Sequence, residues 1–257
     1  MTRIWPAISL VIPMYNEAQR IDKMFDVLVS FSHRWTGSIQ VILVDDGSTD
    51  LTKKKVTDFV NSVITSEKMT FEVISYPINE GKGYALKMGV KAVKHDYFIT
   101  LDADMAASPD NLLSWFSATD VSPQTIYIGS REHQNSYVLD KKVRRMTGRA
   151  FNFFVRLISG LPFFDTQCGF KWYPKYIGSF LFDHLQSSGW VHDVELLLTA
   201  ALLEIKVQEK PVVWAYQPNS KLSLWKDGIL TVIQLIIVRL SIRSRNRELK
   251  SAYFKKQ

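Results

Sequence analysis

Short runs of Ile, Val, Leu and Phe alternate with helical patterns along the first 130 residues of the chain. Several of these runs are almost continuously apolar, which is typical of strands that are buried on both faces of a parallel sheet. We predict strands at Ile8–Ile12, Gln40–Val44, Phe71–Ser75, Tyr97–Leu101 and Thr125–Ile128, and one more at Lys206–Val213.

Between the strands, apolar side chains recur at helical spacing. Residues 21–28 place Ile21, Met24, Phe25 and Leu28 on one face, and residues 86–93 show a similar stripe surrounded by lysines. Alternation of strands and helices predicts an α/β fold, a doubly wound and mostly parallel Rossmann-like sheet with right-handed connections.

A polar cluster follows each of the first four predicted strands. These clusters are Pro13–Glu17, Asp45–Ser48, Asn79–Gly83 and Asp102–Asp104. Because ligands of such sheets collect at the carboxyl ends of the strands, we expect all four clusters at one edge of the sheet.

Composition and charge narrow the classes of partner. Apolar residues make up 46% of the 257 residues and the formal net charge is +7, which favours phosphates, nucleic acid or an anionic membrane. The acidic sheet edge argues against nucleic acid, whose phosphates it would repel.

The single Cys168 excludes an intrachain disulfide and suits a reducing compartment. The longest apolar-rich run, Ile229–Val238, is shorter than the roughly 20 residues that a spanning helix needs, so we predict no transmembrane span. Near the N-terminus Pro6 interrupts the run Ile4–Val11, so we predict no signal peptide.

Asp102 and Asp104 carry the sharpest chemical signal. They leave a buried strand with one alanine between them. Two carboxylates at a strand end can hold a hard divalent cation that bridges phosphate oxygens, although Asp is also common in turns and caps.

Two further clusters fit a nucleotide ligand. Asp45 and Asp46 can hydrogen-bond a base or ribose, while Gly47-Ser48 suits a tight turn. Gly81-Lys82-Gly83 can let the backbone approach a pyrophosphate while Lys82 adds charge, although this motif alone is weak.

In combination these motifs resemble the family 2 glycosyltransferases, which have the GT-A fold. The resemblance spans nearly the whole chain, and QCGFK with HDVELL is most similar to the dolichyl-phosphate glucosyltransferases among polyprenyl-phosphate sugar synthases. The matching stretches are Ser9–Glu17, Val44–Thr52, Asn79–Ala85, Leu101–Asp104, Gly129–Arg131, Gln167–Lys171 and Trp190–Leu197.

The resemblance implies a function for each matching residue. It implies an inverting, metal-dependent transfer of glucose from UDP-glucose to a polyprenyl or dolichyl phosphate. The sites would be Pro13, Tyr15, Glu17, Asp45 and Asp46 for the nucleoside, Lys82 and Asp102 for the nucleotide sugar, and Asp102 and Asp104 for Mg or Mn. Ala106 stands where mannosyl relatives often have a glutamine, so the third metal ligand stays open.

The acceptor side rests on different residues. A polyprenyl phosphate is already anionic and needs no strong general base, so we expect Arg131 and Arg144 to neutralise it. Asp193 resembles the position that acts as a catalytic base when relatives use hydroxyl acceptors; here it would be that base or would orient the sugar or a cation.

Two amphipathic segments and a basic tail suggest a membrane surface. Residues 141–161 carry a polar stripe of Arg145, Arg149, Asn152 and Arg156 beside a wide apolar face, and residues 227–245 are similar. Arg239–Gln257 holds seven basic residues against Glu248 alone. Such helices can lie in a membrane interface, although amphipathic helices commonly pack on their own core.

We therefore expect a GT-A domain at 1–222 and a membrane-interfacial helix and tail at 223–257. The chain would act peripherally at the cytoplasmic face of a membrane, the endoplasmic reticulum in a eukaryote or the plasma membrane in a prokaryote. The alternatives are a polyprenyl-phosphate mannosyltransferase that uses GDP-mannose, a soluble polysaccharide transferase, and a non-catalytic nucleotide-sugar-binding module.

Overall fold

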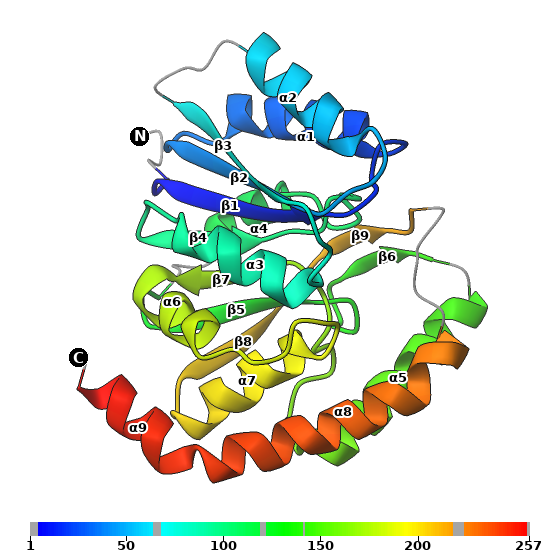
Figure 1. Ribbon diagram of the computed structural model, residues 1–257, viewed down its shortest axis with the longest axis vertical. Helices are drawn as coiled ribbons and strands as arrows, with labels where there is room; N and C mark the ends of the chain where they lie inside the picture. The colour runs from blue at the N-terminus through cyan, green and yellow to red at the C-terminus, as the bar shows by residue number, and fades with distance from the viewer. Residues whose placement is uncertain (1–4, 64–67, 119–121, 141, 218–223, 256–257) are drawn as a thin grey trace.

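The structure is a computed structural model that describes residues 5–63, 68–118, 122–140, 142–217 and 224–255. Within the helices, the side chains of residues 117–118, 142–147, 150–151 and 224–231 lie outside the description. Figure 1 shows a central sheet with helices on both faces and a further group of helices along one side.

The central sheet has seven strands in the order β3-β2-β1-β4-β7-β5-β8. Neighbouring strands are parallel except at β7, which runs antiparallel to both β4 and β5. This mostly parallel arrangement confirms the predicted fold class. The strands are β1 (Ile8–Met14), β2 (Ile39–Asp46), β3 (Met69–Tyr76), β4 (Tyr97–Thr100), β5 (Thr125–Ser130), β7 (Lys171–Pro174) and β8 (Lys206–Pro211).

Strand β7 was not predicted from the sequence. Its four residues, Lys171 to Pro174, do not form an apolar run, yet all four are buried between β4 and β5. Lys171 is fully buried because its ammonium group has partners inside the protein, and such partners are not legible from local pattern.

A small second sheet lies at the carboxyl edge of the large one. It pairs β6 (Tyr137–Leu139) with β9 (Val213–Ala215), as Figure 1 shows. The single strand predicted at Lys206–Val213 is therefore wrong in its extent, because β8 ends at Pro211. The amide of Val213 then donates to the Asn111 side chain at 2.7 Å, which turns the chain away from the large sheet.

Two helical layers cover the sheet. Helices α1 (Ile21–Arg34), α2 (Thr52–Ser62) and α4 (Asn111–Ala118) lie on one face, and α3 (Lys82–Lys91), α6 (Lys175–Asp183) and α7 (His192–Leu202) lie on the other. Strand β1 serves both cores, since Leu10 and Ile12 pack toward α1 while Val11 packs toward α3. This double burial explains the almost unbroken apolar runs.

A third group of helices follows the outer side of α7 and β8 (Figure 1). It consists of α5 (Lys142–Ser159), α8 (Leu224–Ser244) and α9 (Asn246–Phe254), and α8 packs against both α5 and α7. The proposed domain boundary after residue 222 lies outside the described residues. In the described ranges, every helix is too short or too polar to cross a bilayer.

Candidate active site

A cavity of about 430 Å³ opens at the carboxyl ends of β1, β2 and β4. The structure thus brings the four polar clusters together at one edge of the sheet, where the strand order placed them. The lining includes Pro13, Tyr15, Glu17, Arg20, Asp46, Asn79, Lys82, Asp102, Asp104, Arg131, Trp190 and Trp214. Asp45 and Asp193 do not line it, and the side chain of Arg144 lies outside the described part of the structure.

A larger surface groove of about 630 Å³ lies at the amino end of β4, between α6 and α9. Its lining includes Asp96, Lys175, Asp183 and Tyr253 and none of the predicted site residues. The chemistry therefore concentrates in the smaller cavity, where charged groups of both signs converge.

Asp102 and Asp104 both face the 430 Å³ cavity. Asp104 accepts a hydrogen bond of 2.9 Å from the amide of Ala106, while burial and then the charge of Asp102 raise the pKa of Asp104. A Cβ atom on Gly169 would lie 2.4 Å from an Asp102 carboxylate oxygen, so the glycine of the QCGFK motif makes room for this carboxylate.

These two carboxylates fit a hard divalent cation. Their like charges oppose each other, and a cation would relieve that repulsion. Within the described ranges, no three His, Cys, Asp or Glu side chains gather into a metal-binding cluster. A cation here would therefore take its remaining ligands from substrate phosphates and water, as Mg²⁺ commonly does.

Lys82 lies beside the carboxylate pair at the first turn of α3. Its Nζ is 2.5 Å from Oδ1 of Asp102 and 5.5 Å from the centroid of the Trp190 ring. Burial alone would lower the pKa of Lys82, but the charges of Asp102 and Asp193 outweigh it and raise the pKa. Lys82 is thus a protonated cation held beside the carboxylate pair.

The backbone amides around Lys82 have hydrogen-bond partners within the protein. The amides of Gly83 and Tyr84 donate to the carbonyl of Ser188 at 2.6 Å and 3.3 Å, and the amide of Gly81 donates to Asp46 at 3.0 Å. These three amides are therefore hydrogen-bonded within the protein, and a close approach of this backbone to a pyrophosphate stays a prediction. Gly83 permits a close backbone approach, because a Cβ there would lie 2.5 Å from the carbonyl oxygen of Ser187.

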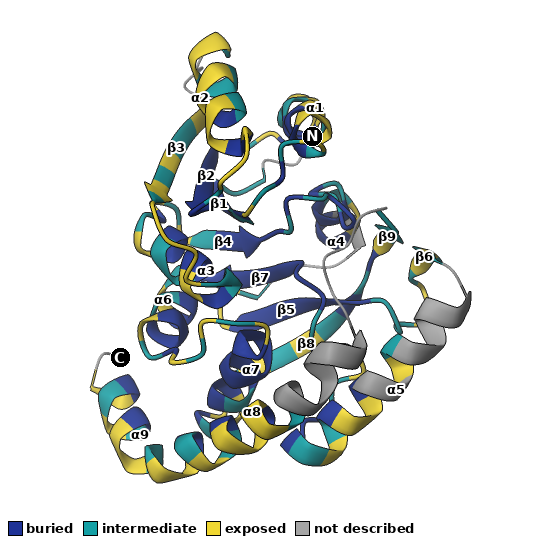
Figure 2. Ribbon diagram, turned by 45° about the vertical axis from the view of Figure 1, so that its right-hand side comes forward, coloured by how far each residue is buried: buried dark blue, intermediate teal, exposed yellow. Residues whose placement is uncertain are grey.

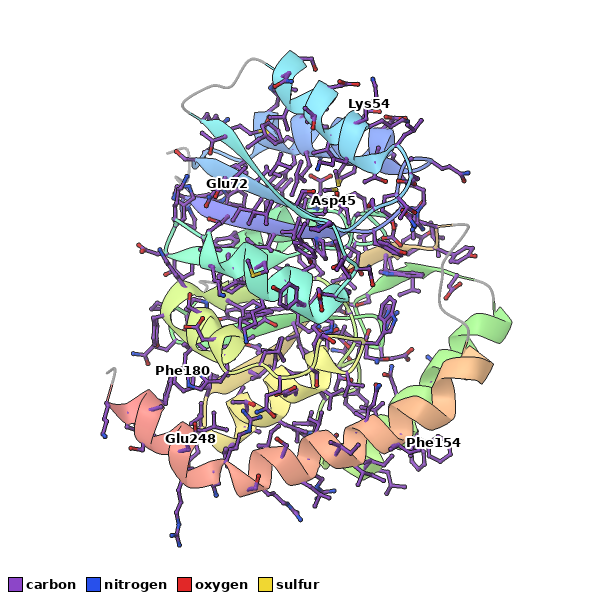
Figure 3. The ribbon with its side chains drawn as sticks, in the orientation of Figure 1. Asp45, Lys54, Glu72, Phe154, Phe180 and Glu248 are labelled. Atoms are coloured by element: carbon purple, nitrogen blue, oxygen red, sulfur yellow. The ribbon has the colours of Figure 1, made fainter. Side chains whose placement is uncertain are left out.

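The adjacent carboxylates of Asp45 and Asp46 hold different segments of the chain. The Asp46 carboxylate accepts hydrogen bonds from the hydroxyl of Tyr76, the side chain of Asn79 and the amides at 80 and 81, at 2.7 to 3.0 Å. It therefore fixes the loop that leads to Lys82. Asp45, labelled in Figure 3, accepts from the amide of Ser48 and the hydroxyl of Ser75 and so closes its own turn.

Arg20 is a cavity residue that the sequence analysis missed. Its Nε and Nη2 each lie 2.7 Å from a carboxylate oxygen of Glu17 in a bidentate pair. Burial lowers the pKa of Arg20, but Glu17 and then Asp104 and Asp102 raise it overall. Its buried Nη1 has no hydrogen-bond partner among the described residues. Only the spacing of Glu17 and Arg20, three residues apart at a helix start, hinted at this pair.

Arg131 is held in place by Asp165, a second residue that the sequence analysis missed. Nε and Nη2 of Arg131 donate to the two oxygens of Asp165 at 2.7 Å and 2.8 Å, and the Arg131 amide donates to the same carboxylate. Burial would raise the pKa of Asp165, but Arg131 lowers it overall, so this fully buried carboxylate is charged. The guanidinium also lies 5.7 Å from the centroid of the Trp214 ring.

Asp193 forms an ion pair with Lys171 away from the cavity lining. Nζ of Lys171 lies 2.6 Å from Oδ1 of Asp193 and donates to the carbonyl of Cys168 at 2.6 Å. Burial would raise the pKa of Asp193, but His192, Lys171 and Lys82 lower it to about 2. So weak a base is poorly suited to remove a proton from a hydroxyl acceptor. The ion pair with Lys171 joins the QCGFK and HDVELL motifs.

Glu195 supports the wall of the cavity. Its two oxygens accept the amides of Gln186 and Ser187 at 3.0 Å and 2.8 Å, just before Gly189 and Trp190 of the lining. Arg245, after α8, donates to Glu195 at 3.2 Å. The C-terminal helices therefore contact the loop that shapes the cavity.

Comparison with known proteins agrees with this geometry. Residues 9–177 match the model of glycosyl transferase family 2. The chain is 31% identical to a dolichyl-phosphate beta-glucosyltransferase of Saccharomyces cerevisiae, over 91% of this chain and 74% of that protein. It is 32% identical to the protein of the same name from Mus musculus, over 91% and 75%.

A solved structure supports the fold. The glucosyl-3-phosphoglycerate synthase of Mycobacterium tuberculosis, crystallised with Mn²⁺, UDP and glucosyl-3-phosphoglycerate, matches with a TM-score of 0.62 and 17% identity. The match covers 92% of this chain and 79% of that chain, and it confirms the predicted GT-A fold. The family model and the sequence relatives show that the chain belongs to glycosyl transferase family 2.

Proposed function

We propose that this protein transfers glucose from UDP-glucose to a polyprenyl or dolichyl phosphate, with inversion at the anomeric carbon. The observation that carries the proposal is one cavity in which Asp102 and Asp104 lie beside the cations Lys82, Arg20 and Arg131. Such a set suits a nucleoside diphosphate leaving group and an anionic acceptor at the same time. The names of the relatives supply the sugar and the acceptor class.

The donor would lie over the ends of β1, β2 and β4. Pro13, Tyr15 and Glu17 would hold the nucleoside on one side of the cavity. Asp46 would serve the donor chiefly by fixing the loop of Lys82, because four donors of the protein already engage its carboxylate. Lys82 and Arg20 would neutralise the diphosphate.

Asp102 and Asp104 would hold Mg²⁺ or Mn²⁺, which when bound would stabilise negative charge on the departing diphosphate. An oxygen of the acceptor phosphate would attack the anomeric carbon as the bond to the nucleoside diphosphate breaks. Because that oxygen is already anionic near neutral pH, no general base is required. Arg131 would orient the acceptor phosphate, and Asp165 would keep its guanidinium fixed.

A lipid acceptor places the reaction at a membrane surface. We propose that the chain acts peripherally at a cytoplasmic membrane face, that of the endoplasmic reticulum in a eukaryote or of the plasma membrane in a prokaryote.

The test is a transfer assay with the purified protein, Mg²⁺ or Mn²⁺, a short polyprenyl phosphate and a panel of labelled sugar nucleotides. Metal-dependent labelling of the lipid phase from UDP-glucose supports the proposal, and Asp104→Ala should abolish it. Asp58→Ala, which removes an exposed carboxylate on α2, should leave it unchanged. Transfer from GDP-mannose would overturn the donor, while absence of turnover at saturating substrates would favour a non-catalytic binding module.

A further inference from the structure

Helices α5 and α8 carry large apolar side chains that face outward. On α5, Phe153, Phe154 and Leu157 are 60%, 54% and 66% exposed. On α8, Ile236, Ile237 and Leu240 are 46%, 58% and 58% exposed. Figure 2 shows exposed positions along the outer side of both helices. A group of this kind on adjacent elements marks an interaction surface rather than ordinary surface scatter.

The outward apolar residues are not needed to hold α8 on the protein. Leu235, Val238 and Ile242 already bury the inner side of α8 in the core that includes α7. Polar groups also point inward: Ser241 donates to the side chain of Gln186 at 2.9 Å, and Arg245 reaches Glu195. Apolar side chains therefore lie on both the inner and the outer side of this part of α8.

The two outward rows belong to one surface. Helices α5 and α8 pack side by side, and the guanidinium of Arg239 on α8 donates to the carbonyl of Ile158 at the end of α5. Leu157 and Leu240 are the chain neighbours of these two bonded residues, so they lie at the same level of the helix pair. Figure 3 shows Phe154 on the outer side of the pair.

Charge complementarity selects the partner. Residues 141–161 contain six Lys and Arg and no Asp or Glu, and residues 239–257 contain seven against one. Two of these seven, Arg239 and Arg245, make hydrogen bonds within the protein, which leaves five others in that segment. A two-fold contact with a second copy would bring like charges together, since it pairs the same patch with itself. An anionic bilayer would instead accept the apolar side chains below its headgroups and the basic ones among them.

We propose that the outer faces of α5 and α8 are a membrane-docking surface that inserts into the interface of an anionic bilayer. The lipid acceptor of the proposed function explains why such a surface would be present. The docking itself requires neither donor nor acceptor. It is therefore measured without either substrate.

The experiment is flotation of the full chain with phosphatidylcholine vesicles that contain or lack phosphatidylglycerol. The chain should float with the anionic vesicles, and added salt should weaken binding. Leu157→Ser and Leu240→Ser should each lower the partition coefficient on the order of tenfold, since each removes apolar contact with the bilayer. Leu51→Ser is the matched control, because Leu51 is 62% exposed at the start of α2, far along the chain from both helices.

Four results distinguish docking to a bilayer from contact with a second copy of the chain. Equal flotation of Leu157→Ser, Leu240→Ser and the parent chain would overturn it, provided that their thermal unfolding is unchanged. A lipid-free dimer in sedimentation equilibrium that Leu157→Ser dissociates would assign the surface to a second copy. Transfer to a water-soluble short-chain acceptor should survive both substitutions. Vesicle binding without any transfer by the parent chain would sink the proposed function and leave the docking surface standing.

Discussion

The donor cavity and the outer face of α5 and α8 both depart from the usual arrangement of apolar interior and polar surface, but in opposite directions. Around the cavity, charged groups such as Asp165 and Lys171 are fully buried. On the outer face, side chains such as Phe153 and Leu157 are more than half exposed.

The two regions differ in whether their unusual side chains have partners inside the protein. Each buried charge around the cavity has a named partner within hydrogen-bond distance, so the protein itself offsets the cost of burial. The exposed apolar side chains of α5 and α8 lie on the outside of the molecule, where only another molecule or a membrane could cover them. The buried charges around the cavity are thus paired inside the protein, whereas the apolar side chains of the outer face have no cover among the described residues.

The largest expected effect is on the Lys171–Asp193 pair. Lys171→Met leaves a buried carboxylate without its cation and should lower the free energy of unfolding by about 3–5 kcal/mol. Lys171→Met with Asp193→Leu should recover much of that loss, because no unpaired charge remains. Urea unfolding of the three proteins measures both effects. A double variant no more stable than Lys171→Met would show that this pair is not what stabilises the region.

The second largest effect is expected at Asp104, one of the two carboxylates that face the cavity. Asp104→Asn keeps the shape of Asp104 but removes its charge, and it should reduce transfer by about 10²–10³-fold with little change in thermal unfolding. Steady-state rates at several metal concentrations check this. Full activity at raised metal would mean that Asp104 only assists metal affinity.

The pKa of Asp193 predicts a contribution to stability that depends on pH. The folded pKa is about 2, below the ordinary value of 3.8, so the contribution is present above about pH 4 and is lost as pH falls through about 2. It amounts to about 2 kcal/mol. Urea midpoints between pH 5 and about pH 2 should show this loss for the parent chain, and Asp193→Asn should show a shallower fall. Parallel curves would contradict the assignment.

Arg20 provides a smaller test of the cavity. Arg20→Gln removes a cation fixed beside Asp102 and Asp104 and should weaken binding of the nucleoside diphosphate by about tenfold. Calorimetric titration with UDP and Mn²⁺ measures it. Arg34→Gln is the matched control, since Arg34 pairs with Asp110 at the surface and should bind UDP like the parent.

The smallest effect should come from the contact between the two regions. Arg245→Ala breaks the link from the end of α8 to Glu195, which holds the loop before Trp190. We expect KM for the donor to rise about threefold while kcat changes little, because the loop loses one of several supports. An unchanged KM would show that the outer helices and the cavity are independent.

Much of the cavity was predictable because it follows from strand ends. Asp102 and Asp104 come just after the buried strand β4, Lys82 lies in the loop and helix start after β3, and parallel strands bring such positions to one edge. Their partners were not predictable. Arg131 meets Asp165 from 34 residues away, and Lys171 meets Asp193 from 22. No local pattern encodes such pairings, since they depend on where β7 and α7 pack.

The outer helices show the same limit in another form. Amphipathic spacing predicted helices α5 and α8, but not which side would face the protein. Asn152, which belongs to the predicted polar stripe, is buried, whereas Phe153 and Phe154 are exposed. Local composition also could not show that the amide of Gly83 donates to the carbonyl of Ser188, about a hundred residues away along the chain.

The sequence by itself determined the fold class, the edge of the sheet that carries the site and the carboxylate pair within it, because periodicity and strand ends are local properties of the chain. Tertiary structure alone decided which carboxylates face the cavity, which cations they meet and which side of α8 looks outward. Those outcomes depend on the balance between burying apolar surface and pairing every buried charge, and that balance is set only when distant segments pack together.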